Sequence, residues 1–165
     1  MASIARKTGK SSIRAAPWAV QKNSINQINQ QQYTISFWIY PIAAKTSAAQ
    51  TGNMWGDTKY LGEWKHILHI GDLDAKTGRP TFQSPGFWLS PQLNKLNVML
   101  YPKNGGGKER IEIDNLNLNA WTHVTAVLDY SSASIYLNGR LERTTTMRTN
   151  LPSITNVDNL YIGPM

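Results

Sequence analysis

Aromatic and polar residues alternate in one stretch of this 165-residue chain. Trp55, Tyr60 and Trp64 share that stretch with Asn53 and Asp57. Aromatic rings can stack on the faces of sugar rings, while amides and carboxylates bond the hydroxyl groups. The stretch therefore predicts a sugar-binding loop. An alternative stays open, in which the same rings fold back and cap the protein core.

Two histidines, His66 and His69, stand three positions apart in a segment that is predicted to be a strand. Successive side chains of a strand point to opposite faces, so an odd spacing separates the two rings. A zinc ion needs ligands that converge on one point. The spacing therefore predicts that these histidines do not share a metal ion.

Positive charge is concentrated in the first third of the chain. The formal net charge is +7, and residues 1–56 contain six basic residues and no acid, whereas the remainder contains eleven basic and ten acidic residues. Residues 1–32 are predicted to form a basic, then amide-rich N-terminal extension, and its first cations are Arg6, Lys7, Lys10 and Arg14. We expect these cations to dock onto another protein chain, with a targeting peptide as the alternative. They are too sparse to predict nucleic acid as the main partner.

The composition also excludes some classes of protein. The chain has no cysteine, so no disulfide can hold its fold. It has no apolar N-terminal run fit for a signal peptide and no segment long enough to span a membrane. We therefore expect a protein that is not secreted through a signal peptide and that works in a virion or in a cytoplasmic assembly.

The elements that must position these residues are β-strands. In residues 121–129 the odd positions from Trp121 lie on one face and the even positions from Thr122 on the other, and a turn signal follows at Asn138-Gly139. Further strands are predicted at 33–40, 66–71, 86–90, 96–101, 109–114, 134–138 and 159–163. Short strands between turns predict one antiparallel β-sandwich over residues 33–165. The tryptophans within the strands, predicted to be core, are Trp38, Trp88 and Trp121.

Four segments carry a family resemblance. They are Trp-Thr-His-Val-Thr-Ala-Val-Leu-Asp followed by Ile-Tyr-Leu-Asn-Gly-Arg-Leu within 121–141, Tyr-Thr-Ile-Ser-Phe-Trp-Ile-Tyr-Pro at 33–41, Ile-Leu-His-Ile-Gly-Asp at 67–72 and Leu-Tyr-Ile-Gly at 160–163. In this order they resemble laminin-G-like domains of the concanavalin A-like lectin/glucanase superfamily. The resemblance implies an all-β, antiparallel jelly-roll sandwich. Such a domain is usually a binding or adhesion module and only sometimes an enzyme.

The resemblance also implies where catalysis or a metal would be found. Related glycosidases carry three acids as Glu-x-Asp-x-Glu or Glu-x-Asp-x-x-Glu. This chain has Glu112 and Asp114, but Leu116 and Asn117 stand where the third acid would be, so we expect no enzyme. Some laminin-G-like domains bind calcium in loops, and the only comparable pair is Asp72 and Asp74. The further ligands of a calcium loop are missing, so we expect an ordinary turn and no cofactor.

The resemblance further implies one more strand after residues 160–163, where this sequence reads Gly163-Pro164-Met165. A missing strand would leave a sheet edge, which either the N-terminal segment or a neighbouring chain would cover. We therefore predict a structural or assembly protein that docks onto other protein chains. Its resemblance to structural components of large DNA viruses suggests a minor capsid or virion component. The alternative is a carbohydrate-binding, lectin-like module whose partners are glycans.

Overall fold

The computed structural model describes residues 32–42, 65–73, 80–90, 95–101, 109–147 and 159–163. These residues form nine strands and no helix, and hence none that could cross a membrane. The strands are β1 (Gln32–Ile39), β2 (Lys65–Leu73), β3 (Pro80–Leu89), β4 (Leu96–Tyr101), β5 (Glu109–Ile113), β6 (Thr122–Asp129), β7 (Ser132–Leu137), β8 (Arg140–Thr146) and β9 (Asn159–Ile162).

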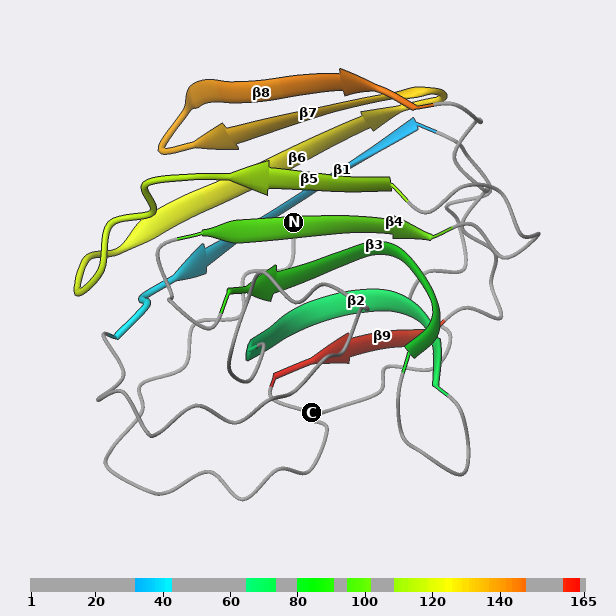
Figure 1. Cartoon of the computed structure of the whole chain (residues 1–165), viewed down its shortest axis with the longest axis horizontal. Coiled ribbons are helices and arrows are strands. Elements are labelled where there is room, and N and C mark those ends of the chain that lie inside the picture. The colour runs from blue at the N-terminus through cyan, green and yellow to red at the C-terminus, as the bar shows by residue number, and fades with distance from the viewer. Residues whose placement is uncertain are drawn as a thin grey trace.

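The strands form two antiparallel sheets around one core. One sheet has the order β1-β6-β7-β8 and the other the order β5-β4-β3-β2-β9. In Figure 1 most of the four-stranded sheet lies in the upper part of the view and most of the five-stranded sheet in the lower part. The edge strands β5 and β8 are in contact with each other. Both sheets contribute to the same cluster of buried apolar residues. The predicted all-β sandwich is therefore confirmed.

The alternation in β6 and β7 explains why these segments form the centre of the four-stranded sheet. The even positions of β6 from Thr122 to Leu128 are buried and the odd positions are only partly so. In β7, Ile135 and Leu137 are buried while Ser134 and Tyr136 are less so. Each strand thus gives one face to the core, as its period of two requires.

The turn between β7 and β8 forms at Asn138-Gly139, as predicted. Both residues have positive φ, 50° and 81°, which is the conformation of a tight hairpin turn. The backbone amide of Asn138 donates to the carbonyl of His123 over 2.8 Å. The amide of His123 in turn donates to Oδ1 of Asn138 over 2.9 Å, so the turn is tied to β6.

Strand β8 was not among the predicted strands. Its sequence, Arg-Leu-Glu-Arg-Thr-Thr-Thr, has no apolar face, and all of its residues are exposed or only partly buried. It forms because its backbone pairs with β7, starting from the tight turn. Strand β3 likewise begins at Pro80, earlier than predicted, and register shifts interrupt its pairing with β2 and β4.

None of the three strand tryptophans belongs to the core cluster. Trp88 is buried on the opposite face of β3 from the core residue Phe87, and the exposed fraction is 62% for Trp38 and 61% for Trp121. Trp38 lies between Phe37 and Ile39, which pack on or belong to the core, so the alternation directs it outward. Trp121 lies just before β6, opposite in phase to the buried Thr122. The prediction of a core position was therefore wrong for both.

Truncating Leu128 to alanine should destabilise the sandwich strongly. This side chain is 1% exposed in the centre of the core, and a buried Leu→Ala change costs about 2–5 kcal/mol. Urea denaturation measures the loss. The same substitution at Leu141, which is 51% exposed, should cost about 0.5 kcal/mol or less. Equal losses at the two positions would contradict the assigned core.

Candidate functional site

The five-stranded sheet has one face toward the core and one face away from it. Leu68, Phe87, Val98 and Ile111 belong to the core. We call the opposite side the outer face. Its first row of paired residues is His66, Trp88, Asn97 and Glu112, and its second row is Tyr161, His69, Gly86, Met99 and Arg110.

The two histidines lie together on this face, which contradicts the prediction that their spacing separates them. The register between β2 and β3 shifts between His66 and Leu68, so the strict alternation is broken there. Nε2 of His66 is 2.8 Å from Nδ1 of His69. The rings also pack on neighbours: His66 lies against Trp88, and His69 stacks on Tyr161. The two histidines therefore form a pair because of a register shift that the sequence pattern does not predict.

The hydrogen bonds of the pair define its tautomers. Nδ1 of His66 contacts the carbonyl oxygen of Gly163, which can only accept, so this nitrogen carries a proton. Nε2 of a neutral His66 is then an acceptor and receives the proton of His69 Nδ1. Nε2 of His69 is left as an acceptor and has no hydrogen-bond partner.

Burial keeps both rings neutral. Loss of solvent lowers the pKa of His66, although the bond to Gly163 acts in the opposite direction. Burial, and then the nearby charge of His66, lowers the pKa of His69 to about 3. Near neutral pH the pair therefore acts as an uncharged hydrogen-bonding unit.

The outer face holds further polar groups without partners. Among the described residues, the buried side-chain atoms that lack a hydrogen bond are Nε2 of His69, Oγ of Ser90, and both Nδ2 and Oδ1 of Asn97. Asn97 is 0% exposed and pairs across the sheet with Trp88 and Glu112. Ser90 directly follows β3, in phase with Trp88. Since nearly all buried polar groups in proteins are paired, this set marks a place where a partner is expected.

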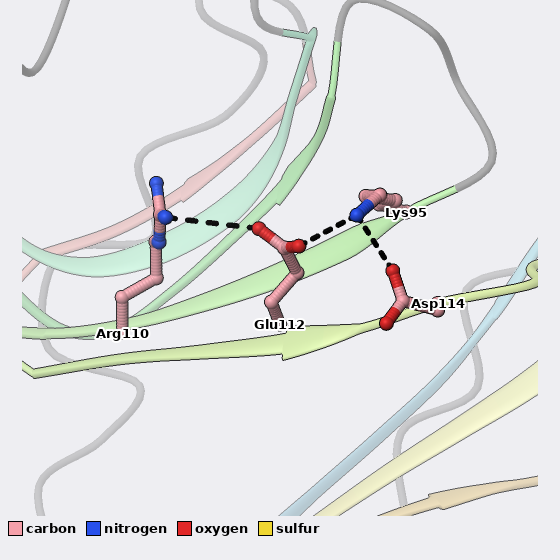
Figure 2. Close-up of polar contacts among 4 residues, drawn as sticks. All are labelled: Lys95, Arg110, Glu112 and Asp114. Atoms are coloured by element: carbon pink, nitrogen blue, oxygen red, sulfur yellow. Dashed lines mark hydrogen bonds and ion pairs between the residues drawn. The ribbon is translucent and has the colours of Figure 1, made fainter. Parts of the chain in front are cut away.

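Charged side chains form a rim beside Asn97 on the edge strand β5. Figure 2 shows Nζ of Lys95 between the two acids, 2.7 Å from Oε1 of Glu112 and 2.7 Å from Oδ1 of Asp114. Nη2 of Arg110 lies 3.7 Å from Oε2 of Glu112. All four side chains are partly exposed. Glu112 and Asp114, two positions apart in the sequence, thus both bind one ammonium group.

Exposed aromatic rings gather on the outside of the other sheet. Trp38 lies against His123, with 4.9 Å between ring centroids, and Tyr40 lies against Trp121 at 5.4 Å. We call these residues, together with the exposed Ile42, the aromatic strip. It is formed by β1 and by the start of β6, which pair antiparallel.

Other predicted site residues lie outside what the structure describes. These are Asn53, Trp55, Asp57, Tyr60 and Trp64 of the loop, Arg6, Lys7, Lys10 and Arg14 of the extension, and Asp74. Asp72 lies in β2 opposite Phe82. Within the described ranges no three His, Cys, Asp or Glu residues are grouped to hold a metal. The sugar loop, the docking arm and the calcium pair therefore stay predictions.

The sequence reasoning did not find Asn97, Ser90 or Lys95. An asparagine in a strand gives no sign of being buried without a partner, because this depends on which strands lie beside it. The pattern Leu-Asn-Val-Met-Leu at 96–100 carried the only usable signal, a polar residue inside an apolar strand.

The chain belongs to the concanavalin A-like lectin/glucanase superfamily, whose laminin-G-type family model matches residues 17–164. No curated protein matches it in sequence. It is similar to the CBM40 module of a Ruminococcus gnavus IT-sialidase, with a TM-score of 0.56, 15% identity, and coverage of 81% of this chain and 64% of that one. The chain thus spans just under two thirds of that module.

Two further solved structures are similar. One is the Ruminococcus gnavus module bound to α2,6 sialyllactose, with a TM-score of 0.55, 15% identity, and coverage of 81% of this chain and 65% of that one. The other is the binding domain of botulinum neurotoxin serotype G, with a TM-score of 0.53, 20% identity, and coverage of 80% and 28%. At these identities the likeness shows the fold alone.

The histidine pair should make the fold sensitive to acid. An unfolded histidine binds a proton near pH 6.5, whereas folded His69 does so only at about 3. Between these values the unfolded chain holds more protons, so the free energy of unfolding should fall as the pH is lowered from 6.5 toward about 3. Urea denaturation at several pH values measures this slope.

A matched substitution separates this effect from general acid unfolding. His69→Gln should flatten the slope between pH 6.5 and 4, while His123→Gln, at a partly exposed position of β6, should leave it unchanged. An unchanged slope in His69→Gln would show that the buried pair does not govern the acid response.

Proposed function

We propose that the chain is a non-catalytic carbohydrate-binding module that holds a sugar on the outer face of the five-stranded sheet. The observation that carries the proposal is the set of buried, unpartnered polar atoms of His69, Ser90 and Asn97 beside a charged rim. A sugar would enter from the partly exposed edge at β5, where Arg110 and Glu112 lie.

The chemistry of these groups suits hydroxyl groups. A sugar hydroxyl both donates and accepts, and the carboxamide of Asn97 offers one group of each kind. Nε2 of His69 and the carboxylate of Glu112 accept, while Lys95 and Arg110 donate. A ligand with several hydroxyl groups can use such donors and acceptors across adjacent strands of a sheet.

The fold supports the same function. The Ruminococcus gnavus module was solved with α2,3 and with α2,6 sialyllactose, so a neighbour of this fold binds glycans. The acids support the non-catalytic part of the proposal, because Lys95 binds both Glu112 and Asp114, and Leu116 and Asn117 stand where the related glycosidases carry a third acid. The proposal is therefore a binding role without a reaction.

A glycan array followed by titration calorimetry on the best ligand tests this proposal. Asn97→Ala and Glu112→Gln should each weaken binding about tenfold or more, because each removes hydrogen bonds to a desolvated sugar. Gln32→Ala, which removes a carboxamide from the opposite sheet, should bind like the parent chain. Thermal denaturation confirms that each variant is folded. A parent chain that binds no glycan, or folded variants that bind equally well, would overturn the proposal.

The aromatic strip favours a second candidate function, docking onto another protein chain. Trp38, Ile42 and Trp121 are among the most exposed large apolar residues that the structure describes. Contiguous apolar surface of this kind is typical of protein interfaces, where tryptophan is enriched. In this candidate the strips of two copies pack together. No observation on the described residues supports a role in a virion.

Self-association tests this second candidate. The double variant Trp38→Ser, Trp121→Ser should lower the mass measured by light scattering from that of a dimer or larger assembly to that of a monomer. Tyr130→Ser, which removes an exposed aromatic ring at the other end of β6, should leave the assembly intact. A parent chain that is monomeric at every concentration would rule out docking between copies.

A further inference from the structure

A polar cleft lies at the end of the sandwich where β5 ends and β7 turns into β8. Its volume is about 320 Å³. Its polar lining comes from Asp114, Asn115 and Asn117 after β5, and from Asn138, Arg140 and Glu142 around the turn and the start of β8. Figure 1 shows both connections at the same end of the molecule.

Hydrogen bonds and burial hold both walls of the cleft. In the wall after β5, Leu116 is buried in the core, and the amide of Asn119 donates to the carbonyl of Pro41 over 2.7 Å. In the other wall, Asn138 is bonded to His123 through both its backbone and its side chain. The side chains that line the cleft therefore project from anchored backbone.

The cleft is polar but balanced in charge. Asp114 is paired with Lys95, and Nη2 of Arg140 lies 2.8 Å from Oε1 of Glu142. A simple anion would be attracted by Arg140 but repelled by the two carboxylates. A metal ion would compete with a cation that each carboxylate already has. The lining suits an uncharged ligand with many hydroxyl groups, which the amides and carboxylates can bond.

The floor of the cleft adds an apolar contact. Leu116, Thr122 and Leu137 complete the lining, and the two leucines offer apolar surface beside the polar groups. Sugar rings combine apolar C–H faces with hydroxyl edges, which is the same combination of surfaces.

The cleft also adjoins the rim of the outer face. Asp114 lines the cleft, and its carboxylate is bonded to Lys95, which bonds Glu112 of the rim. A ligand that leaves the outer face across the edge strand β5 would reach the cleft next. We propose that the cleft is a second sugar subsite, so that the ligand is a chain of two or more sugar rings. This inference rests on the proposed function and extends it from a single sugar to an oligosaccharide.

Titration calorimetry with glycans of increasing length tests the second subsite. The probes are gluco-, xylo-, manno- and chito-oligosaccharides of one to six units, with 3′- and 6′-sialyllactose. For the parent chain, affinity should rise about tenfold from the shortest to the longer members of the series that binds, because the second ring binds as an intramolecular event. Arg140→Ala and Asn117→Ala should abolish this rise and leave the affinity for the shortest ligand unchanged. Arg143→Ala, at an exposed position of the same strand outside the cleft, should keep the rise.

The outcomes separate the subsite from the proposed function. If the folded Arg140→Ala and Asn117→Ala chains keep the full rise while Asn97→Ala still loses binding, the cleft is not a subsite and the sugar-binding face stands. If the parent chain binds none of the probes, both proposals are overturned. Loss of all binding in Arg140→Ala, including the shortest ligand, would also contradict a second subsite, because it would make the cleft the primary one.

Discussion

The constraint on which the rest of this structure depends is that a strand gives every second side chain to each of its faces. In both sheets the same alternation that builds the core decides what stands on the opposite side. Val98 in the core implies that Asn97 and Met99 face away from it, and Ile111 does the same for Arg110 and Glu112. The residues of the candidate binding face therefore alternate, along the same strands, with the core residues that make the sandwich stable.

Much of the fold could be predicted from the sequence because alternation is a local signal. The segments 122–129 and 132–137 show it on either side of a turn, and the structure forms β6 and β7 there. Strand β8 has no apolar alternation, and its existence depends on its neighbour β7, which a local pattern cannot show. Trp38 and Trp121 were misplaced for a different reason. They were predicted to be core because they lie within predicted strands, whereas their phase directs them outward.

The candidate site could be predicted only in part. The acid pattern of related glycosidases singled out Glu112 and Asp114, but the ammonium that binds both comes from Lys95, which lies outside that pattern. The histidine pair depends on an irregular register between two strands, and no single residue type announces it. Asn97 is functionally informative because of what surrounds it. The neighbours of Asn97 come from adjacent strands. They therefore depend on how the strands pair across the whole sheet, which a local sequence pattern does not show.

The unpartnered polar atoms of the outer face also lower the stability of the folded chain. Each buried polar group without a hydrogen bond destabilises the folded chain, by about 1–3 kcal/mol. A sandwich selected for stability alone would place apolar side chains at the positions of Asn97 and Ser90. Keeping polar groups there is consistent with a site whose hydrogen bonds are completed by a ligand, since binding then returns stability to the fold.

The unequal burial of the described tryptophans gives this protein optical reporters on both of its sides. Trp88 lies inside, against His66 on the outer face of the five-stranded sheet, whereas Trp38 and Trp121 stand in solvent on the other sheet. Indole fluorescence shifts to longer wavelength and becomes accessible to dissolved quenchers when the ring is hydrated. A ligand on the outer face would perturb the blue-shifted, protected part of the emission. A partner on the aromatic strip would instead shield the red-shifted, quenchable emission of Trp38 and Trp121, so the described tryptophans report separately on the two sides.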